Sequence, residues 1–266
     1  MTMTSLREIA GTIQSQHTVE GGGFNVRRPF PTAKLDQIDP FLLLDEMGPA
    51  EYAPGKAVGA PSHPHRGFET VTYMLSGSMV HEDSTGTKAV IKKGGVQWMT
   101  AGSGVIHSEL PTDDMMKLGG RMHGFQLWVN LPAAQKMIDP RYQGYEAEEM
   151  ATVQLAKGGH IRVVAGVVHG AKGPVETTSP MTYAHAGLEV GDVVEWLPEE
   201  GHTALIHVFG GEARVNESTS VSGEMVVLQR TAGLVRVEAT TSAAQILIMG
   251  GLPLGEPMVR YGPFVM

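Results

Sequence analysis

The most informative stretch of the chain is His63-Pro-His-Arg-Gly-Phe-Glu-Thr-Val-Thr-Tyr-Met-Leu75. It begins with two histidines two residues apart and continues into a run of β-branched and aromatic residues, which favours a strand. Alternate residues of an extended chain share one face, so the imidazoles of His63 and His65 project to the same side. The stretch therefore predicts a strand segment that presents two nitrogen ligands together.

A second pair of potential ligands follows in the stretch Gln97-Trp-Met-Thr-Ala-Gly-Ser-Gly-Val-Ile-His-Ser-Glu109. His107 and Glu109 are again two residues apart, and His107 comes 42 positions after His65. That interval accommodates a few strands and turns that return the second pair beside the first. Three imidazoles and one carboxylate without sulfur suit iron, manganese, nickel, copper, cobalt or zinc, and leave open positions on an octahedral ion. The competing interpretation is that all four are ordinary polar residues at strand ends.

The composition narrows the function classes. The chain has 266 residues, of which 42% are hydrophobic and 18% charged, and it is rich in glycine (34) and proline (16). This favours many short strands and few long helices. Twenty basic against 28 acidic residues give a net charge of −8, so no basic field attracts nucleic acid or an anionic membrane directly. The absence of cysteine excludes disulfides, thiolate metal sites and a cysteine nucleophile.

The order of β-prone runs predicts a duplicated all-β protein. Short runs separated by glycines occur in both halves of the chain, and a polar stretch at 139–158 lies between them. We expect one domain over residues 1–140 and a second over residues 141–266. The first residues, MTMTSLREIAGTIQ, have no apolar signal core, and no run of 18 apolar residues occurs, so a cytoplasmic protein without a membrane span is expected.

The histidine motifs together with three other segments resemble the pirin family of bicupins. The other segments are His81-Glu-Asp-Ser84, Gln126-Leu-Trp-Val-Asn-Leu-Pro132 and Val259-Arg-Tyr-Gly-Pro-Phe-Val-Met266. The resemblance implies two antiparallel β-sandwich (jelly-roll) cupin domains with few short helices. It implies one metal in the first domain, usually iron, on the four residues that match the family's ligands: His63, His65, His107 and Glu109.

The resemblance also implies a function. Some family members oxidise flavonols such as quercetin with O2, whereas others resemble nuclear cofactors of transcription that sense the redox state of iron. We therefore expect a dioxygenase that uses Fe(II), with manganese, nickel, cobalt, copper or zinc as alternatives, and a small aromatic substrate. The alternative is a metal- and redox-dependent regulator that binds a protein partner without turnover. A third hypothesis is that the metal has a purely structural role.

Two glutamates compete for the role of the carboxylate ligand. The general cupin pattern takes its carboxylate from the first motif, where Glu69 lies, whereas pirin-like proteins take it from the second, which favours Glu109 as the ligand. Glu69 then supports a ligand, acts as catalytic base, or is a plain strand residue; either Glu69 or Glu109 would take a proton from the substrate. Gln97 is expected to orient a ligand histidine or to bond backbone.

The second half of the chain lacks an equivalent ligand set. When Gly211 is aligned with Gly77, and Gly223 with Gly94, the positions of the three ligand histidines are occupied by Leu197, Glu199 and Arg236. The second domain is therefore expected to be metal-free. The other histidines, His81 and His123 among them, are expected to be structural or surface residues, and the tryptophans to lie in the core.

Overall fold

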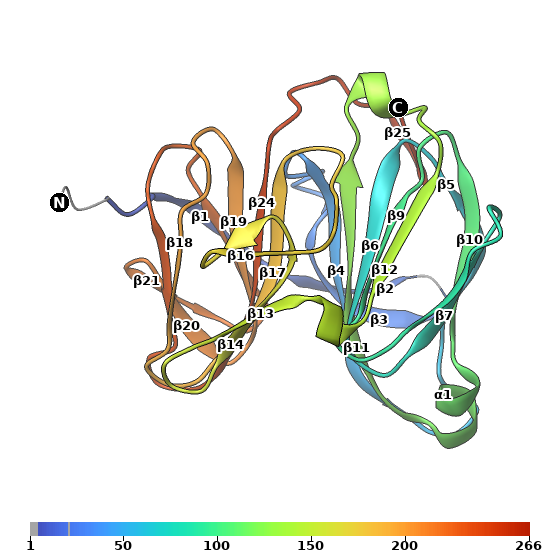
Figure 1. The fold of residues 1–266 in the computed structure, drawn as a ribbon, viewed down its shortest axis with the longest axis horizontal. Helices are drawn as coiled ribbons and strands as arrows, with labels where there is room; N and C mark the ends of the chain where they lie inside the picture. Colours follow the sequence, from blue (N-terminus) through green and yellow to red (C-terminus); the bar gives the residue numbers. More distant parts are fainter. Residues whose placement is uncertain (1–4, 21) are drawn as a thin grey trace. The chain divides into compact units, whose positions relative to one another are not determined.

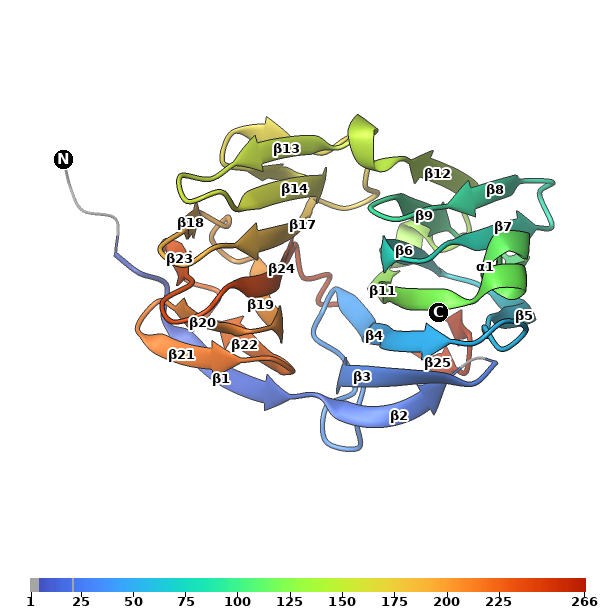
Figure 2. The same cartoon turned by 90° about the horizontal axis from the view of Figure 1, so that it is seen from below.

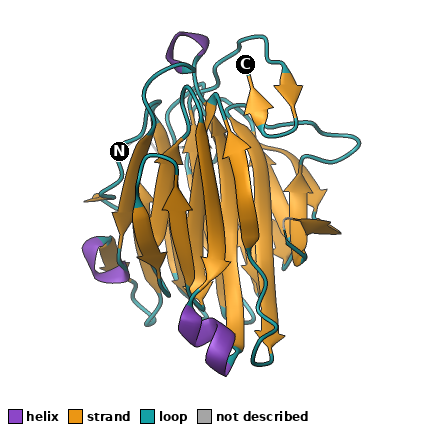
Figure 3. Ribbon diagram, turned by 90° about the vertical axis from the view of Figure 1, so that its right-hand side faces the viewer, coloured by secondary structure: helices purple, strands orange, loops and turns teal. Residues whose placement is uncertain are grey.

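The computed structural model describes residues 5–20 and 22–266, and these residues form mostly antiparallel β-strands (Figure 1, Figure 3). They divide into two compact units. The N-terminal unit comprises Gln16–Glu149 and Leu254–Met266, and the C-terminal unit comprises Met150–Pro253 with the described residues up to Ser15. Within the described residues, each unit contains one seven-stranded and one four-stranded sheet, so the all-β duplication expected from the sequence is confirmed.

The N-terminal unit is a two-layered β-sandwich (Figure 2). Its large sheet has the order β12-β9-β6-β11-β4-β3-β2, and its small sheet the order β5-β10-β7-β8. The elements are β2 (Gln16–Glu20), β3 (Phe24–Phe30), β4 (Phe41–Tyr52), β5 (Ala60–His65), β6 (Phe68–Ser76), β7 (Met79–Asp83), β8 (Lys88–Ile91), β9 (Val96–Thr100), β10 (Val105–Pro111), α1 (Asp113–Leu118), β11 (Gly120–Asn130) and β12 (Arg141–Tyr145), with short 3-10 turns at Ala133–Gln135 and Ala147–Glu149.

The core of this unit lies between its two sheets. Phe24, Val26 and Met47 on the large sheet pack in one buried cluster with Met79 and Ile91 on the small sheet. Burying such apolar surface is the main stabilising contribution to a sandwich of this kind. Four members of this cluster, Phe24, Val26, Met47 and Met79, also line a cavity whose wall includes His63 and His65.

The C-terminal unit repeats the arrangement with an interior built from apolar side chains. Its large sheet has the order β1-β22-β19-β24-β17-β14-β13, and its small sheet the order β18-β23-β20-β21. The strands are β1 (Ile9–Gln14), β13 (Ala151–Gln154), β14 (His160–Ala165), β15 (Val167–Val168), β16 (Ala171–Lys172), β17 (Met181–Leu188), β18 (Val193–Trp196), β19 (Thr203–Gly210), β20 (Glu212–Val215), β21 (Ser218–Val221), β22 (Glu224–Leu228), β23 (Val235–Glu238) and β24 (Ala244–Gly251). Its core cluster contains aliphatic residues, alanines and Trp196.

The two chain ends are exchanged between the units. Strand β1, near the amino terminus, pairs with β22 of the C-terminal unit. The carboxyl-terminal tail, Leu254–Met266, belongs to the N-terminal unit and carries the short strands β25 (Arg260–Tyr261) and β26 (Phe264–Val265). From the sequence, one domain was expected over residues 1–140 and a second over residues 141–266. That division does not assign either chain end to the other half. None of the described helices is long and apolar enough to cross a bilayer.

The tail is fixed beside the first histidine motif. The Val265 amide donates to the carbonyl of Arg66 (2.9 Å), and the Arg66 amide donates to the carbonyl of Pro263 (3.3 Å). Gly67 follows directly with a positive φ of 82°. A Cβ at this position would clash with the carbonyl oxygen of Val265, so the tail can lie here only because residue 67 has no side chain.

Replacing Gly67 with alanine is expected to lower the melting temperature clearly. The left-handed backbone alone costs a non-glycine residue about 1 to 3 kcal/mol, and the clash with Val265 adds to that cost. The matched control is Gly55→Ala, because Gly55 also has a positive φ (74°) but has open space around its Cβ position. Thermal unfolding of both variants checks the prediction, and equal melting temperatures would contradict it.

Candidate metal centre

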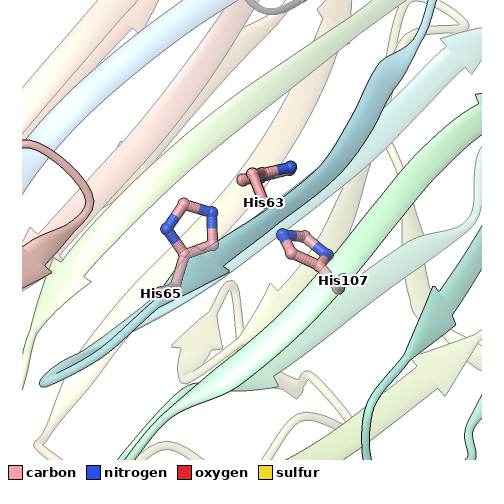
Figure 4. Close-up of side chains that lie close together, drawn as sticks. All are labelled: His63, His65 and His107. Atoms are coloured by element: carbon pink, nitrogen blue, oxygen red, sulfur yellow. The ribbon is translucent and has the colours of Figure 1, made fainter.

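Three histidines of the N-terminal unit converge from two adjacent strands. Strands β5 and β10 are antiparallel, with His107 opposite His63 and Val105 opposite His65. The ring centroids lie 4.7 Å (His63–His65), 4.4 Å (His63–His107) and 5.0 Å (His65–His107) apart. One nitrogen of each ring lies within 4.8 Å of the others. Figure 4 shows the three imidazoles close to one another, with His63 and His65 projecting from one strand and His107 from its neighbour. The structure thus brings together three of the four ligands that the spacing suggested.

The nitrogens in this group have the free lone pairs that a cation requires. His65 Nδ1 and His107 Nε2 are buried, and within the described residues neither has a hydrogen-bond partner. His63 Nδ1 lies 2.7 Å from the carbonyl oxygen of Pro61, which makes it the protonated nitrogen and leaves Nε2 free to coordinate. Buried polar atoms in folded proteins are normally paired, so two converging unpaired nitrogens fit a bound metal ion.

Burial keeps two of these imidazoles neutral. Desolvation, with a smaller contribution from His63, lowers the pKa of His65 to about 3. Desolvation and the neighbouring histidines lower the pKa of His107 to about 2. A metal binds the neutral imidazole, so both groups are in the binding form throughout the neutral range.

The metal-free protein is expected to lose stability as the pH falls from about 6.5 towards 3. Histidines of the unfolded chain take up protons in this window, whereas His65 and His107 in the folded protein do not, so acid favours unfolding. At pH 5 the expected loss is on the order of 1 to 2 kcal/mol for each histidine. Urea unfolding of chelator-treated protein at pH 7.5 and pH 5 measures it. The variant His65→Gln should show a smaller pH dependence, and an unchanged dependence would contradict the assignment.

Glu109 lies on β10, the strand that carries His107, and its carboxylate accepts two hydrogen bonds. Its carboxylate oxygen Oε1 accepts a hydrogen bond from Thr72 Oγ1 (2.6 Å) and another from Gln97 Nε2. Burial raises the pKa of Glu109, although the Thr72 hydrogen bond and nearby histidines oppose the shift. Glu109 is not a member of the close group of three histidines. Gln97 contacts this carboxylate, whereas the sequence suggested a ligand histidine or the backbone as its partner.

Glu69 lies on the other face of its strand. On β6, Phe68 stacks edge-on against His65 (5.1 Å between ring centroids), and Thr72 contacts Glu109. These two residues mark the face of β6 towards the histidines, and alternation along a strand puts Glu69 on the opposite face. There, Thr100 Oγ1 donates to Glu69 Oε1 at 2.7 Å. The structure therefore does not bring Glu69 to the three histidines.

A cavity of about 500 Å³ within the N-terminal unit reaches two of the three histidines. Apolar side chains form much of its wall, and its lining also includes His63, His65 and Glu109. Further lining residues are Phe24, Val26, Arg28, Leu43, Asp45, Met47, Met79, Gln126, Trp128 and Arg260. The size and the apolar wall suit a flat organic molecule that reaches the histidines.

None of these further lining residues was identified from the sequence as part of the site, Trp128 and Arg260 among them. Trp128 was expected in the core, as Trp98 and Trp196 are, but its ring lines the cavity 5.1 Å from the His65 ring. Arg260, on the tail, lies with its guanidinium carbon 5.1 Å from the centre of the Trp128 ring. Gln126 and Trp128 are two residues apart on one strand, and this alternation could have suggested that both side chains face the cavity. No local pattern in the sequence indicates that the tail with Arg260 lies there.

The fold and the histidine group together define the class of protein. Two similar two-sheet β-sandwiches in one chain, the first with three converging imidazoles on neighbouring strands, are the architecture of a bicupin. Residues 23–129 match the family model described as Pirin, and residues 183–266 match the model described as Pirin C-terminal cupin domain. The chain therefore belongs to the pirin family.

Individual relatives support this membership. The chain is 41% identical over 263 residues to a pirin-like protein of Caulobacter vibrioides, covering 98% of this chain and 93% of the relative. It is 39% identical over 280 residues to a Pseudomonas aeruginosa protein provisionally named quercetin 2,3-dioxygenase, covering 99% and 93%. A crystal structure of quercetin 2,3-dioxygenase from Acinetobacter baumannii matches with a TM-score of 0.93 and 37% identity, covering 98% of this chain and 92% of that one.

Proposed function

We propose that this protein is a metal-dependent dioxygenase that cleaves a flavonol such as quercetin with O2. The observation that carries the proposal is the group of His63, His65 and His107, with unpaired buried nitrogens, at an apolar cavity large enough for a flat aromatic molecule. Relatives of similar length that bear the name quercetin 2,3-dioxygenase support it.

The metal would be held by the three histidines and by Glu109, whose second oxygen, Oε2, is available because Thr72 and Gln97 both donate to Oε1. These nitrogen and oxygen donors suit Fe(II) first, with manganese, nickel, cobalt, copper or zinc as alternatives. When bound, the metal would acidify the substrate's 3-hydroxyl and supply the redox chemistry that O2 requires.

The residues of the chain would bind the flavonol and move its proton. The burial that raises the pKa of Glu109 makes this carboxylate a better proton acceptor near neutral pH. Because Glu69 lies on the opposite face of β6, we assign proton acceptance from the 3-hydroxyl to Glu109. The rings of Trp128 and the methionine side chains of the wall would hold the flavonol and exclude water.

The proposed reaction balances without a further reductant. Quercetin (C15H10O7) and O2 give a depside (C14H10O8) and carbon monoxide. The two carbon–carbon bonds to C3 break, C3 leaves as carbon monoxide with its own oxygen, and both atoms of O2 enter the depside. The proton released from the 3-hydroxyl ends on the product carboxyl group.

Labelled oxygen tests the proposal. Iron-loaded protein with quercetin under ¹⁸O2 should release unlabelled carbon monoxide and give a depside that carries both labelled atoms. Chelator-treated protein should give neither product. A loaded protein that leaves quercetin unchanged, or that oxidises it without releasing carbon monoxide, would contradict the proposal.

Replacing Arg260 with methionine is expected to raise the KM for quercetin about tenfold, with a smaller effect on kcat. The guanidinium lines the cavity above Trp128, and no carboxylate of the described residues forms an ion pair with it, so its charge is available to an anionic flavonol. Losing one charge-assisted contact of this kind costs about 1 to 2 kcal/mol. Steady-state kinetics with the control Arg260→Lys, which keeps the charge, checks this. An unchanged KM in Arg260→Met would contradict it.

A further inference from the structure

A second buried histidine stands directly behind His107. His81 lies on β7, which pairs with β10, and its side chain is fully buried. The His81 and His107 rings are 5.3 Å apart between centroids, and their Nδ1 atoms are 3.4 Å apart. On the other side, His81 Nε2 lies 2.9 Å from Asp83 Oδ2. The three side chains therefore form a continuous line that ends at the proposed metal ligand.

The line is consistent with only one placement of protons on neutral rings. An ionised carboxylate can only accept, so His81 Nε2 carries a proton and donates it to Asp83. The neutral His81 ring then has a bare Nδ1, which accepts from Nδ1–H of His107. His107 Nε2 is consequently left with its lone pair, and it is the nitrogen that is buried without a partner in the described residues.

Asp83 is itself fixed in place, so the line starts from a rigid anchor. Its other oxygen, Oδ1, accepts from the backbone amides of Thr85 (2.8 Å) and Thr87 (3.1 Å) and from the Thr85 hydroxyl (2.6 Å). These contacts belong to the turn between β7 and β8, and they leave Oδ2 directed to His81. A carboxylate held by three donors cannot rotate away without losing them.

We propose that Asp83 and His81 are positioning residues that fix the tautomer of His107 and strengthen Nε2 as a metal donor. This inference rests on the proposed metal site. A carboxylate behind a ligand imidazole orients the ring and raises its basicity, and loss of such partners typically weakens metal binding 10- to 100-fold. Here a second imidazole relays the effect of the carboxylate to the ligand.

The competing explanation is a structural role, because the His81 ring also packs against Tyr142 (4.8 Å between centroids). Two variants separate the two roles. His81→Phe keeps a ring against Tyr142 but removes the acceptor, whereas His81→Asn loses the ring but carries a carbonyl oxygen near the position of Nδ1. If His81 only packs against Tyr142, His81→Phe should bind metal as well as or better than His81→Asn. If His81 positions His107, His81→Asn should bind metal more tightly than His81→Phe.

Titration of the chelator-treated full chain with Co(II), monitored by its visible absorption and by competition with a chelator, provides the test. We expect His81→Phe to bind Co(II) about 10- to 100-fold more weakly than the unmodified chain, with an apoprotein melting temperature near normal. His81→Asn should recover affinity to within a few-fold. The matched control is His185→Phe, a buried histidine of the C-terminal unit bonded to Gln245 Oε1 (2.8 Å), which should leave affinity unchanged.

The outcomes distinguish this inference from the proposed metal site. If the unmodified chain binds one Co(II), His63→Ala abolishes binding and His81→Phe binds normally, only the positioning role is overturned. Equal affinities of His81→Asn and His81→Phe would overturn it as well. If the unmodified chain binds no Co(II), both proposals fail. Should His81→Phe not fold, Asp83→Asn replaces it: affinity about tenfold weaker supports the inference, and unchanged affinity overturns it.

Discussion

His107→Ala is expected to lose metal binding and flavonol turnover together while the chain stays folded. His107 supplies one of three converging nitrogens, and its Nε2 has no other partner in the described residues. Structural zinc sites of zinc-finger peptides, which have four ligands, bind with about 10 to 16 kcal/mol in total, so by this measure one ligand corresponds to about 3 kcal/mol. Affinity should therefore fall more than a hundredfold, and turnover should fall to the level of the chelator-treated protein.

Metal content after gel filtration, urea unfolding and turnover measured on the same sample check this prediction. A suitable control is His202→Ala in the C-terminal unit, whose side chain interacts with Glu199 and is not among the residues that line the cavity. It should keep one metal per chain and full activity. A His107→Ala protein that retains both metal and turnover would contradict the assignment of the centre.

Glu109→Gln is expected to lower kcat about 10²- to 10⁴-fold at full metal occupancy. The amide has the size of the carboxylate and can still accept from Thr72, so the local structure should persist. It cannot take up a proton, and it is a weaker ligand, so metal affinity should also fall, though by less than kcat. Activity is therefore normalised to the metal measured in each sample.

Glu69→Gln is the matched comparison, because Glu69 is equally buried but lies on the opposite face of β6. Its kcat should stay within about twofold of the unmodified enzyme, since a group outside the site makes no contact with substrate. A large loss in Glu69→Gln with normal turnover in Glu109→Gln would reverse the assignment of the two carboxylates.

The histidine group could be predicted from the sequence because it depends on local rules. Alternation along a strand fixes which residues share a face, and the interval between His65 and His107 is long enough for the chain to return. The observed register, with His107 opposite His63, brings the second motif beside the first, as this reasoning expected. The all-β class was predictable for the same reason, since short β-prone runs and glycine turns recur along the chain.

The surroundings of the histidines could not be predicted in this way. The role of Glu69 depended on which face of β6 is directed towards the histidines. A single sequence does not show which of the two faces that is. The tail reaches the site through its pairing with Arg66, which no local pattern encodes. His81 was expected to be a structural or surface residue. Its contact with His107 could not be predicted, because it depends on the pairing of β7 with β10, which are not adjacent in sequence.

Oxygen uptake by anaerobically iron-loaded protein on addition of quercetin tests the central claim most directly. The account predicts uptake of one O2 per quercetin consumed, in proportion to bound iron, and none with His107→Ala or with chelator-treated protein. Fully loaded protein that takes up no oxygen would contradict a dioxygenase and would favour a redox-dependent binding protein without turnover.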